Sequence, residues 1–304
     1  ADWRADGVTI DSRDVNSGDM FIAIRGPKFD GHDFTADALA AGAACAVVDH
    51  RPDAVDPDAP LLEVADTMVA LEDLGRAARD RSKAKVIAVT GSVGKTGTKE
   101  ALRFVLEDQA PCVASRGSFN NHWGVPLSLS RMPADSAFGV FEIGMNHPGE
   151  IAPLSRMVRP DVAVITNVEA VHGAHFESVD DIAEAKAEIF QGMTGDGVAV
   201  LNRDNAQFNR LTAAAGEAGV NNVIAFGAHE EAQFRLMDVR TDCEGSDVKA
   251  RIDGAEFQYR LDVPGHHWVM NSLAVLAAVG AAGVEIGPAA VELAGMIGLK
   301  GRGR

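Results

Sequence analysis

The chain has 304 residues, of which 46% are hydrophobic and 24% charged; this is an ordinary globular composition in a chain too long for one small domain. A net charge of −16 without a long Lys/Arg cluster excludes a typical nucleic-acid-binding protein. The most apolar run, Leu273 to Val284, is too short to span a bilayer, and no signal peptide precedes Ala1. Its three cysteines are widely spaced and form no CxxC pair. We therefore expect a cytoplasmic monomer that binds no nucleic acid and inserts into no membrane.

The first 83 residues are predicted to form one small α/β domain. Apolar runs bounded by turn residues predict strands at Thr9–Ile10, Asp19–Ile24, Ala46–Val48 and Leu61–Val64. Helical patterns are found at Phe34–Ala44 and Thr67–Arg81. A charged stretch, 76–85, then leads into another apolar strand, so we place the domain boundary between residues 83 and 84.

The second predicted domain runs from residue 84 to residue 304, and its strands alternate with helices. The expected strands are Val86–Val89, Gly139–Ile143, Val162–Thr166, Val198–Leu201 and Val223–Phe226. This alternation is typical of a parallel sheet covered by helices, in which ligands bind beyond the carboxyl ends of the strands. Residues 229 to 263 contain alternating short runs instead, which predict a small antiparallel extension at Gln233–Val239, Val248–Ile252 and Phe257–Leu261.

A phosphate-binding loop is the strongest motif in the chain. The strand 86–89 leads into Thr-Gly-Ser-Val-Gly-Lys-Thr at 90–96, and a helical pattern follows. Glycines let backbone N–H groups surround an anion, and a helix N-terminus adds a favourable dipole. Lys95 can reach the terminal phosphates of a nucleotide, and the Thr96 hydroxyl can bind Mg²⁺. The loop is a shortened variant of the Walker pattern, because Val89 stands where that pattern requires a glycine.

Polar residues just past two further strands are candidates for the same site. Glu142 ends a buried run beside the loop strand, where a second carboxylate for Mg²⁺ belongs; the alternative is a solvated residue at a strand end. His172 follows the run 162–168, and it is either a metal ligand or an ordinary loop histidine.

Lys186 shares an apolar helical stripe with Ile182 and Phe190, in a helix expected over 182–193 behind an N-cap at Ser178. One interpretation is a lysine whose stem covers the core while its amine reaches solvent. The other is a lysine at the edge of a site, where a lowered pKa would make the amine neutral and reactive toward CO₂. The resulting carbamate would be a carboxylate-like metal ligand.

Two further polar pairs have open interpretations. Asn120 and Asn121 lie between a probable strand and a helix that begins near Pro126; they either contact a polar substrate or form a turn. His267 and Asn271 are four residues apart and share one helix face, where they either cap the helix or meet a base or ribose.

Several segments together resemble the Mur ligase family. In chain order they are Thr90–Thr96, Asn120–Pro126, Glu142–Ile151 and Ala185–Phe190. Three earlier segments resemble the UDP-sugar-binding domain of that family: Asp11–Arg13, Gly18–Ala23 and Asp30–His32. The resemblance covers about Val8 to Arg304, and its most specific segment is Met-Asn-x-x-Gly-Glu at 145–150.

The resemblance implies an ATP-dependent ligase of peptidoglycan precursor synthesis. Its implied reaction adds D-alanyl-D-alanine to UDP-N-acetylmuramoyl-tripeptide through an acyl phosphate, with ATP and Mg²⁺ as cofactors. The implied ATP-binding residues are Gly91, Ser92, Val93, Gly94, Lys95, Thr96, Gly97, His267 and Asn271. The implied metal ligands are Thr96, Glu142, His172 and carbamylated Lys186, and the catalytic residues are Lys95, Glu142, His172 and Lys186. The implied substrate-binding residues are Ser12, Arg13, Asp30, Gly31, His32, Asn120 and Asn121.

Departures from the family pattern are also visible. Trp268 stands where many relatives have Asn, and Gly97 stands where Thr or Ser is frequent. The family's third, Rossmann-like domain, about 150 residues long, has no counterpart here. We therefore expect a fragment trimmed at both ends, which by itself binds ATP and the UDP-linked substrate without ligase activity. The alternatives are the family member that adds the third residue (meso-diaminopimelate or lysine) and a non-catalytic nucleotide-binding module.

Overall fold

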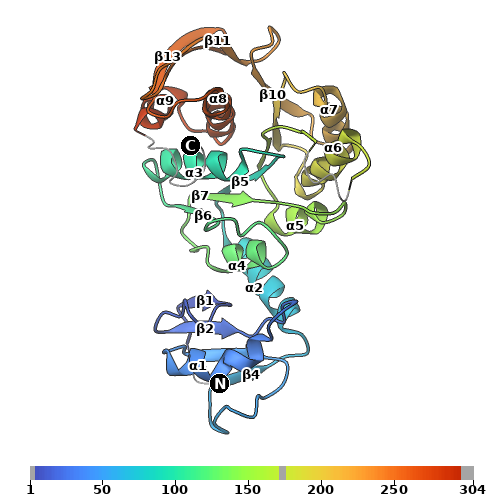
Figure 1. The fold of residues 1–304 in the computed structure, drawn as a ribbon, viewed down its shortest axis with the longest axis vertical. Coiled ribbons are helices and arrows are strands. Elements are labelled where there is room, and N and C mark those ends of the chain that lie inside the picture. Colours follow the sequence, from blue (N-terminus) through green and yellow to red (C-terminus); the bar gives the residue numbers. More distant parts are fainter. Residues whose placement is uncertain (1–3, 171–175, 296–304) are drawn as a thin grey trace. The chain divides into compact units, whose positions relative to one another are not determined.

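The computed structural model describes residues 4–170 and 176–295 (Figure 1). The chain divides into two compact units. Unit 1 comprises Ala1–Arg81 and Pro126–Met132, and unit 2 comprises Ser82–Val125 and Pro133–Arg304. Helix α4 (Gly124–Ser130) therefore begins in unit 2 and continues in unit 1. Both units combine helices with a sheet, which confirms the α/β class expected from the sequence.

Unit 1 contains a parallel sheet with the strand order β1-β2-β3-β4. Successive side chains of a strand point to opposite faces, so Phe21 and Ile22 of β2 enter different cores. Phe21 packs with Ala38 on one face, and Ile22 packs with Leu71 and Leu127 on the other. The elements are β1 (Gly7–Thr9), β2 (Asp19–Ile22), η1 (Gly31–Phe34), α1 (Thr35–Ala40), β3 (Cys45–Val48), β4 (Leu61–Glu63) and α2 (Thr67–Arg81).

Helix α2 has the bounds predicted from the sequence, whereas α1 ends four residues earlier than the expected Phe34–Ala44. The cause is Gly42, which has a φ of 105°. At this left-handed residue the chain turns back, and the N–H of Ala43 donates to the carbonyl of Ala38 over 3.1 Å. A glycine in this conformation is a common helix terminator.

The sheet of unit 2 has the order β13-β12-β11-β10-β9-β8-β5-β7-β6. Pairing is parallel from β6 to β11 and antiparallel from β11 to β13, which confirms the predicted parallel sheet with an antiparallel extension. Its strands are β5 (Lys85–Thr90), β6 (Cys112–Ala114), β7 (Phe138–Glu142), β8 (Val162–Ile165), β9 (Val198–Asn202), β10 (Asn222–Gly227), β11 (Phe234–Thr241), β12 (Ser246–Ile252) and β13 (Ala255–Leu261).

Helices cover both faces of the parallel part of this sheet (Figure 1). Ile87 and Val89 of β5 pack in one hydrophobic cluster with residues of α3 and α8. The helices on that side are α3 (Lys95–Glu107), α8 (His266–Ala281) and α9 (Ile286–Ala294). Those on the other side are α5 (Ile151–Val158), α6 (Val179–Ala187) and α7 (Phe208–Glu217).

Helix α6 begins as the sequence predicts but ends earlier. Ser178 and Asp181 form a reciprocal capping box at its N-terminus. The expected helix over 182–193 instead continues after Ala187 as a 3₁₀ helix, η2 (Glu188–Gly192). The Ser155 hydroxyl of α5 donates to the carbonyl of Ile189, and the N–H of Met193 donates to Phe190, so the next α-helical bond does not form.

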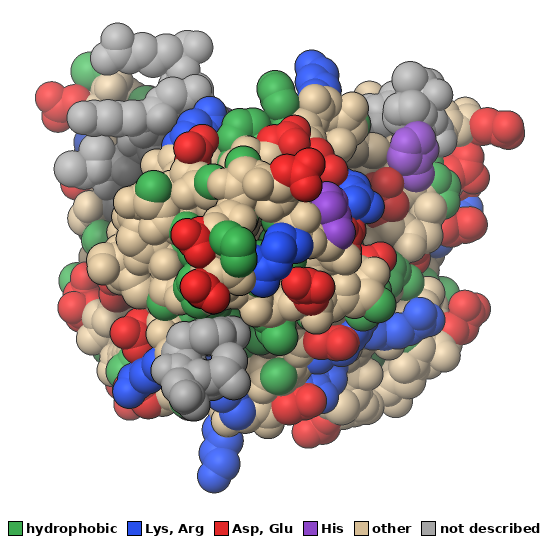
Figure 2. All heavy atoms as spheres, turned by 90° about the horizontal axis from the view of Figure 1, so that it is seen from below, with side chains coloured by type: hydrophobic (Ala, Val, Ile, Leu, Met, Phe, Trp, Pro, Cys, Tyr) green, Lys and Arg blue, Asp and Glu red, His purple; other side chains and the backbone are tan. Residues whose placement is uncertain are grey.

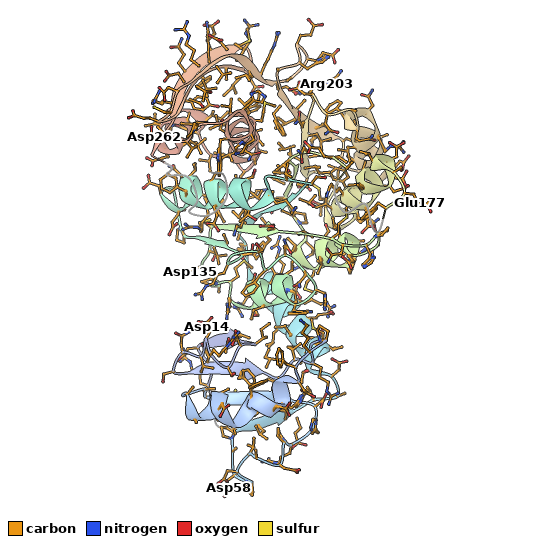
Figure 3. The ribbon with its side chains drawn as sticks, in the orientation of Figure 1. Asp14, Asp58, Asp135, Glu177, Arg203 and Asp262 are labelled. Atoms are coloured by element: carbon orange, nitrogen blue, oxygen red, sulfur yellow. The ribbon has the colours of Figure 1, made fainter. Side chains whose placement is uncertain are left out.

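The acidic excess of the chain is carried by solvent-facing side chains. Asp14, Asp58, Asp135 and Glu177 are exposed, and Figure 3 shows them at the periphery of the ribbon. On the face drawn in Figure 2, Asp and Glu side chains are interspersed with Lys and Arg. Over the described ranges, no helix combines the length and apolarity needed to cross a lipid bilayer.

Candidate active site

The predicted phosphate-binding loop connects the buried strand β5 to the N-terminus of α3. Gly91 and Gly94 have φ values of 149° and 85°, which L side chains rarely adopt. A Cβ on Gly91 would also lie 1.9 Å from the Thr166 hydroxyl oxygen. The sequence therefore places glycine at two positions that this backbone requires. The loop leads directly into the N-terminus of α3, whose dipole favours a bound anion.

Residues just past β8 hold the loop in place. The Thr166 hydroxyl donates to the carbonyl of Val93 over 2.6 Å, and Asn167 Oδ1 accepts from the Val93 N–H over 3.0 Å. The Ser92 hydroxyl accepts from the N–H of Glu169 over 2.9 Å. Thr166, Asn167 and Glu169 had no predicted role, although polar residues at the carboxyl end of a strand were the available signal.

Lys95 lies folded over the loop. Its ammonium donates to the carbonyl of Gly91 over 2.7 Å and to that of Ser92 over 3.3 Å. The charge is thus held at the mouth of the loop, where the phosphates of a nucleotide are expected.

Glu142 is hydrogen-bonded to two other predicted site residues, Thr96 and Asn120. Its side chain is only 1% exposed. Oε2 accepts from the Thr96 hydroxyl over 2.9 Å, and Oε1 accepts from Asn120 Nδ2 over 2.7 Å. The burial contradicts the alternative of a solvated strand-end acid. A buried carboxylate beside a hydroxyl offers oxygen ligands of the kind that Mg²⁺ prefers, so Glu142 and Thr96 fit that ion.

Lys186 is 1% exposed, so its amine does not reach solvent as the first interpretation required. Burial, and secondly the positive charge of Lys95, lower the pKa of Lys186 to about 7. A large share of the amine is therefore neutral near physiological pH. The role of Lys186 as a metal ligand stays a prediction, and His172 lies outside the described residues.

Of the remaining predicted site residues of unit 2, Asn271 contacts the phosphate-binding loop, whereas His267 and Asn121 contact other residues. The Asn271 side chain lies against the loop, because a Cβ on Gly94 would be 2.9 Å from its Oδ1. His267 is exposed and lies beside Trp268. Asn121 Oδ1 accepts from the N–H of Gly124 over 2.9 Å and so forms the turn that was its alternative interpretation.

Gly97 and Trp268, the two residues that depart from the family pattern, lie next to each other in the structure. A Cβ on Gly97 would lie 3.0 Å from two ring carbons of Trp268. The buried indole thus occupies the space that a side chain at position 97 would need. Gly97 in α3 and Trp268 in α8 are therefore matched to each other.

In unit 1, the segment Asp30–His32 lies in a network of charged side chains. The N–H of Asp49 donates to His32 Nε2 over 3.0 Å, so the proton of the neutral ring is on Nδ1, which donates to Asp30 Oδ1 over 2.6 Å. Arg25 Nε donates to Asp30 Oδ2 over 3.0 Å. Burial raises the pKa of Asp30, but hydrogen bonds from His32 and Arg25 outweigh it and bring the pKa to about 2.

Ligand atoms of His32, Asp49 and His50 lie within 4.8 Å of one another, as a metal site would require. The lone pair of His32 Nε2 is already used, however, and Arg25 Nη2 lies 3.0 Å from Asp49 Oδ1. The Arg25 guanidinium thus supplies the positive charge that a metal ion would otherwise supply, and we assign no metal to this network.

The other predicted substrate-binding residues of unit 1 are Ser12, Arg13 and Gly31. Arg13 is exposed, and its guanidinium makes two hydrogen bonds to Asp11, of 2.8 and 2.7 Å. Ser12, between them, is half-buried. Gly31 allows a close approach of backbones, because a Cβ there would lie 2.7 Å from the nitrogen of Ile24.

We expect Gly97→Thr to lower the free energy of unfolding by about 1–3 kcal/mol, because the new side chain would overpack against the indole. The loss should be smaller in the Trp268→Asn background, where the space is open. Thermal unfolding of the two single variants and the double variant measures this coupling. Gly216→Ala is the matched control, because the Cβ of this helical glycine meets nothing within 4 Å. Equal losses in both backgrounds would contradict the pairing.

The lowered pKa of Lys186 makes stability depend on pH. Between pH 7 and the ordinary lysine pKa of 10.5, the unfolded chain binds a proton that the native chain does not. The free energy of unfolding should therefore rise with pH in this window, by at most about 1.4 kcal/mol per unit. Lys186→Met should lack this rise, whereas Lys85→Met, at an exposed lysine, should keep it. Denaturant titrations from pH 7 to pH 10 provide the measurement; identical slopes in all three proteins would contradict the pKa.

Comparison with known proteins places this geometry in a family. Residues 89–279 match the family described as Mur ligase middle domain, and residues 4–80 match Mur ligase family, catalytic domain. The UDP-N-acetylmuramoyl-tripeptide–D-alanyl-D-alanine ligase of Rickettsia prowazekii is 36% identical over 297 residues, which are 98% of this chain and 66% of that protein. The Escherichia coli ligase of the same name is 33% identical over 99% of this chain and 66% of its own length.

Solved structures agree. A crystal structure of MurF from Acinetobacter baumannii has a TM-score of 0.87 at 34% identity, over 97% of this chain and 64% of that one. MurF ligase from Thermotoga maritima, in complex with ADP, has a TM-score of 0.79 at 28% identity, over 93% and 65%. The chain thus spans about two thirds of the length of these relatives. Its loop, its sheet and both of its matched segments lead to one conclusion: the chain belongs to the Mur ligase family.

Proposed function

We propose that this chain provides the substrate-binding and ATP-binding parts of a ligase that adds D-alanyl-D-alanine to UDP-N-acetylmuramoyl-tripeptide in peptidoglycan precursor synthesis. The observation that carries the proposal is buried Glu142, held between Thr96 and Asn120 beside the phosphate-binding loop. The relatives with this name support the choice of substrate. A neighbour that adds diaminopimelate is only 20% identical, which shows a shared fold and no more.

In the proposed first step, the carboxylate of the UDP-linked peptide attacks the γ-phosphate of ATP, and an acyl phosphate and ADP form. The step requires neutralisation of phosphate charge and in-line positioning of the two reactants. Lys95 supplies a positive charge at the loop, and the N-terminus of α3 supplies its dipole. Asn271 lies against Gly94, which supports the proposed contact of α8 with the nucleotide.

Thr96 and Glu142 are the residues we assign to one Mg²⁺, because their oxygens already lie 2.9 Å apart. A bound Mg²⁺ would offset negative charge on the phosphates. Asn120 keeps the Glu142 carboxylate in one orientation, so the carboxylate need not reorganise when the nucleotide arrives. His172 is proposed as a ligand of a second ion.

Lys186 is proposed to carry a carbamate. Its neutral amine would form an N–C bond with CO₂ and release one proton, which leaves a carboxylate-like anion on the side chain. The burial of Lys186 and its pKa of about 7 favour this reaction, because only the neutral amine is nucleophilic. The anion would also be stabilised by the neighbouring charge of Lys95.

We propose that the two domains bind different substrates: residues 1–83 bind the UDP-sugar peptide, and residues 84–304 bind ATP. The network at Asp30–His32 presents arginine, histidine and carboxylate groups suited to a polar sugar nucleotide. In the second step, the amine of D-alanyl-D-alanine displaces phosphate from the acyl phosphate. We assign the reaction to the cytoplasm, in keeping with the free thiols of Cys45, Cys112 and Cys243.

Calorimetric titration with UDP-N-acetylmuramoyl-tripeptide, the corresponding L-alanine form and UMP tests the substrate. We expect the tripeptide form to bind at least about tenfold more tightly than UMP, a difference of about 1.4 kcal/mol. Equal affinities for all three would leave only uridine recognition and would contradict the assigned peptide. A parallel titration with Mg²⁺·ADP should show binding that is lost in Lys95→Ala. Absence of nucleotide binding by the wild-type chain would overturn the ATP-dependent function itself.

The carbamate predicts a specific chemical rescue. In a preparation that releases ADP in response to the tripeptide substrate, Lys186→Ala should lower the rate by about 10–100-fold, as loss of a metal-supporting group commonly does. Acetate should restore part of the rate by replacing the missing carboxylate, whereas bicarbonate should not. Lys85→Ala, at an exposed lysine, is the control. A wild-type rate in Lys186→Ala, or no carbamate signal by ¹³C NMR in labelled bicarbonate, would contradict the assignment.

A further inference from the structure

A second lysine on α3 is completely buried, and nothing in the proposed reaction uses it. Lys99 is 0% exposed and lies three residues after Thr96, close to one helical turn away. Its ammonium lies 2.6 Å from Glu100 Oε1 and donates to the carbonyls of Ser115 and Gly117 over 2.7 and 3.0 Å. The three donors of the ammonium thus have three acceptors.

The two carbonyls that Lys99 holds belong to the segment that leads from β6 to Asn120. Ser115 is the first residue after β6, and its hydroxyl accepts from the N–H of Glu142 over 3.2 Å. Further along the same segment, the carbonyl of Asn120 accepts from the N–H of Gly144 over 2.8 Å. The side chain of Asn120 then donates to Glu142. Lys99 therefore holds a segment that contacts Glu142 at its backbone and at its carboxylate.

The same helix contacts Glu142 from the other side. Thr96 donates to Oε2, while the segment held by Lys99 supplies the donor to Oε1. One rigid element, α3, thus determines where both partners of the carboxylate lie. A buried lysine is a costly way to fill space, and an apolar side chain of similar length would fill it at lower cost. The Glu100 carboxylate balances the charge of Lys99, and the other two donors of the ammonium fix the two loop carbonyls.

We propose that Lys99 is a positioning residue that orients Glu142, through the segment 115–120, for the Mg²⁺-bound nucleotide. The inference rests on the proposed function, since it assumes that Glu142 serves this ion. The three donors of the Lys99 ammonium are already bound within the protein, so we assign Lys99 no contact with the ion or the nucleotide. Its contribution is to fix the Glu142 carboxylate before either binds.

Lys99→Met tests this inference in the 304-residue chain, because it removes the ammonium and keeps a stem of similar length. Calorimetry would measure ADP binding at a series of Mg²⁺ concentrations, and electron paramagnetic resonance would measure Mn²⁺ binding in the presence of ADP. We expect the apparent dissociation constant of the metal to rise about 10–100-fold, and ADP affinity without metal to stay at the wild-type value.

Leu102→Ala is the matched control for general damage to α3. Leu102 is buried on the same helix and packs in the core cluster. Its apolar side chain has no donor for the carbonyls of Ser115 and Gly117. It should lower the melting temperature and leave the metal dependence of ADP binding unchanged. The contrary result is that Lys99→Met lowers the melting temperature in the same way while the metal dependence of ADP binding stays at the wild-type value. Lys99 would then only stabilise the fold, and the inference would be wrong.

Ser115→Ala keeps the proposal testable if Lys99→Met fails to fold. This variant removes the hydroxyl that accepts from the N–H of Glu142 and leaves the carbonyl that Lys99 binds. It should weaken metal binding in the same direction by a smaller factor, and unchanged metal binding would overturn the proposal. Where both variants fold, their combined effect should be less than the product of the single effects. Failure of the wild-type chain to bind ADP at all would instead refute the proposed function.

Discussion

The arrangement of unit 2 around its site depends on one buried carboxylate. Glu142 ends β7, which lies between β5 and β6 in the parallel sheet, and its side chain is buried. A buried carboxylate is costly unless donors surround it. Thr96 at the start of α3 and Asn120 from the loop after β6 provide those donors. Strand order, helix start and loop conformation must therefore be compatible with both hydrogen bonds, and each of them limits the others.

The sequence predicts this region well where its chemistry is local. The glycines of the loop, the acid at the end of β7 and the capping box at Ser178 are short-range patterns, because each depends on neighbouring residues and backbone conformation. Strand assignments also succeed, because β-branched runs between turn residues are long enough to be distinctive. Helix ends were less predictable. After α6 the chain continues as η2, and the carbonyl of Ile189 in η2 is bound by Ser155, which comes from another helix and lies far away in the sequence.

Contacts made only by the folded chain could not be predicted. Lys99 is a lysine in an amphipathic helix, which from sequence suggests a solvated face; its burial depends on a loop sixteen residues later. Thr166 and Asn167 bind the phosphate loop across two adjacent strands. The adjacent amides Asn120 and Asn121 look equivalent in sequence, yet one donates to Glu142 and the other closes a turn. Such differences arise from tertiary packing, which single residues do not encode.

The assignment of Pro126–Met132 to unit 1 has a consequence for anyone who wishes to dissect the protein. Leu127 completes the cluster that contains Leu71 and Ile22, so the polypeptide crosses between the units at three places. A clone that stops after residue 83 would lack one wall of that cluster and would expose leucine and isoleucine side chains. Neither unit can therefore be excised by one cut. An isolated unit 1 that keeps this cluster needs residues 126–132 connected to the end of α2 by a short designed linker.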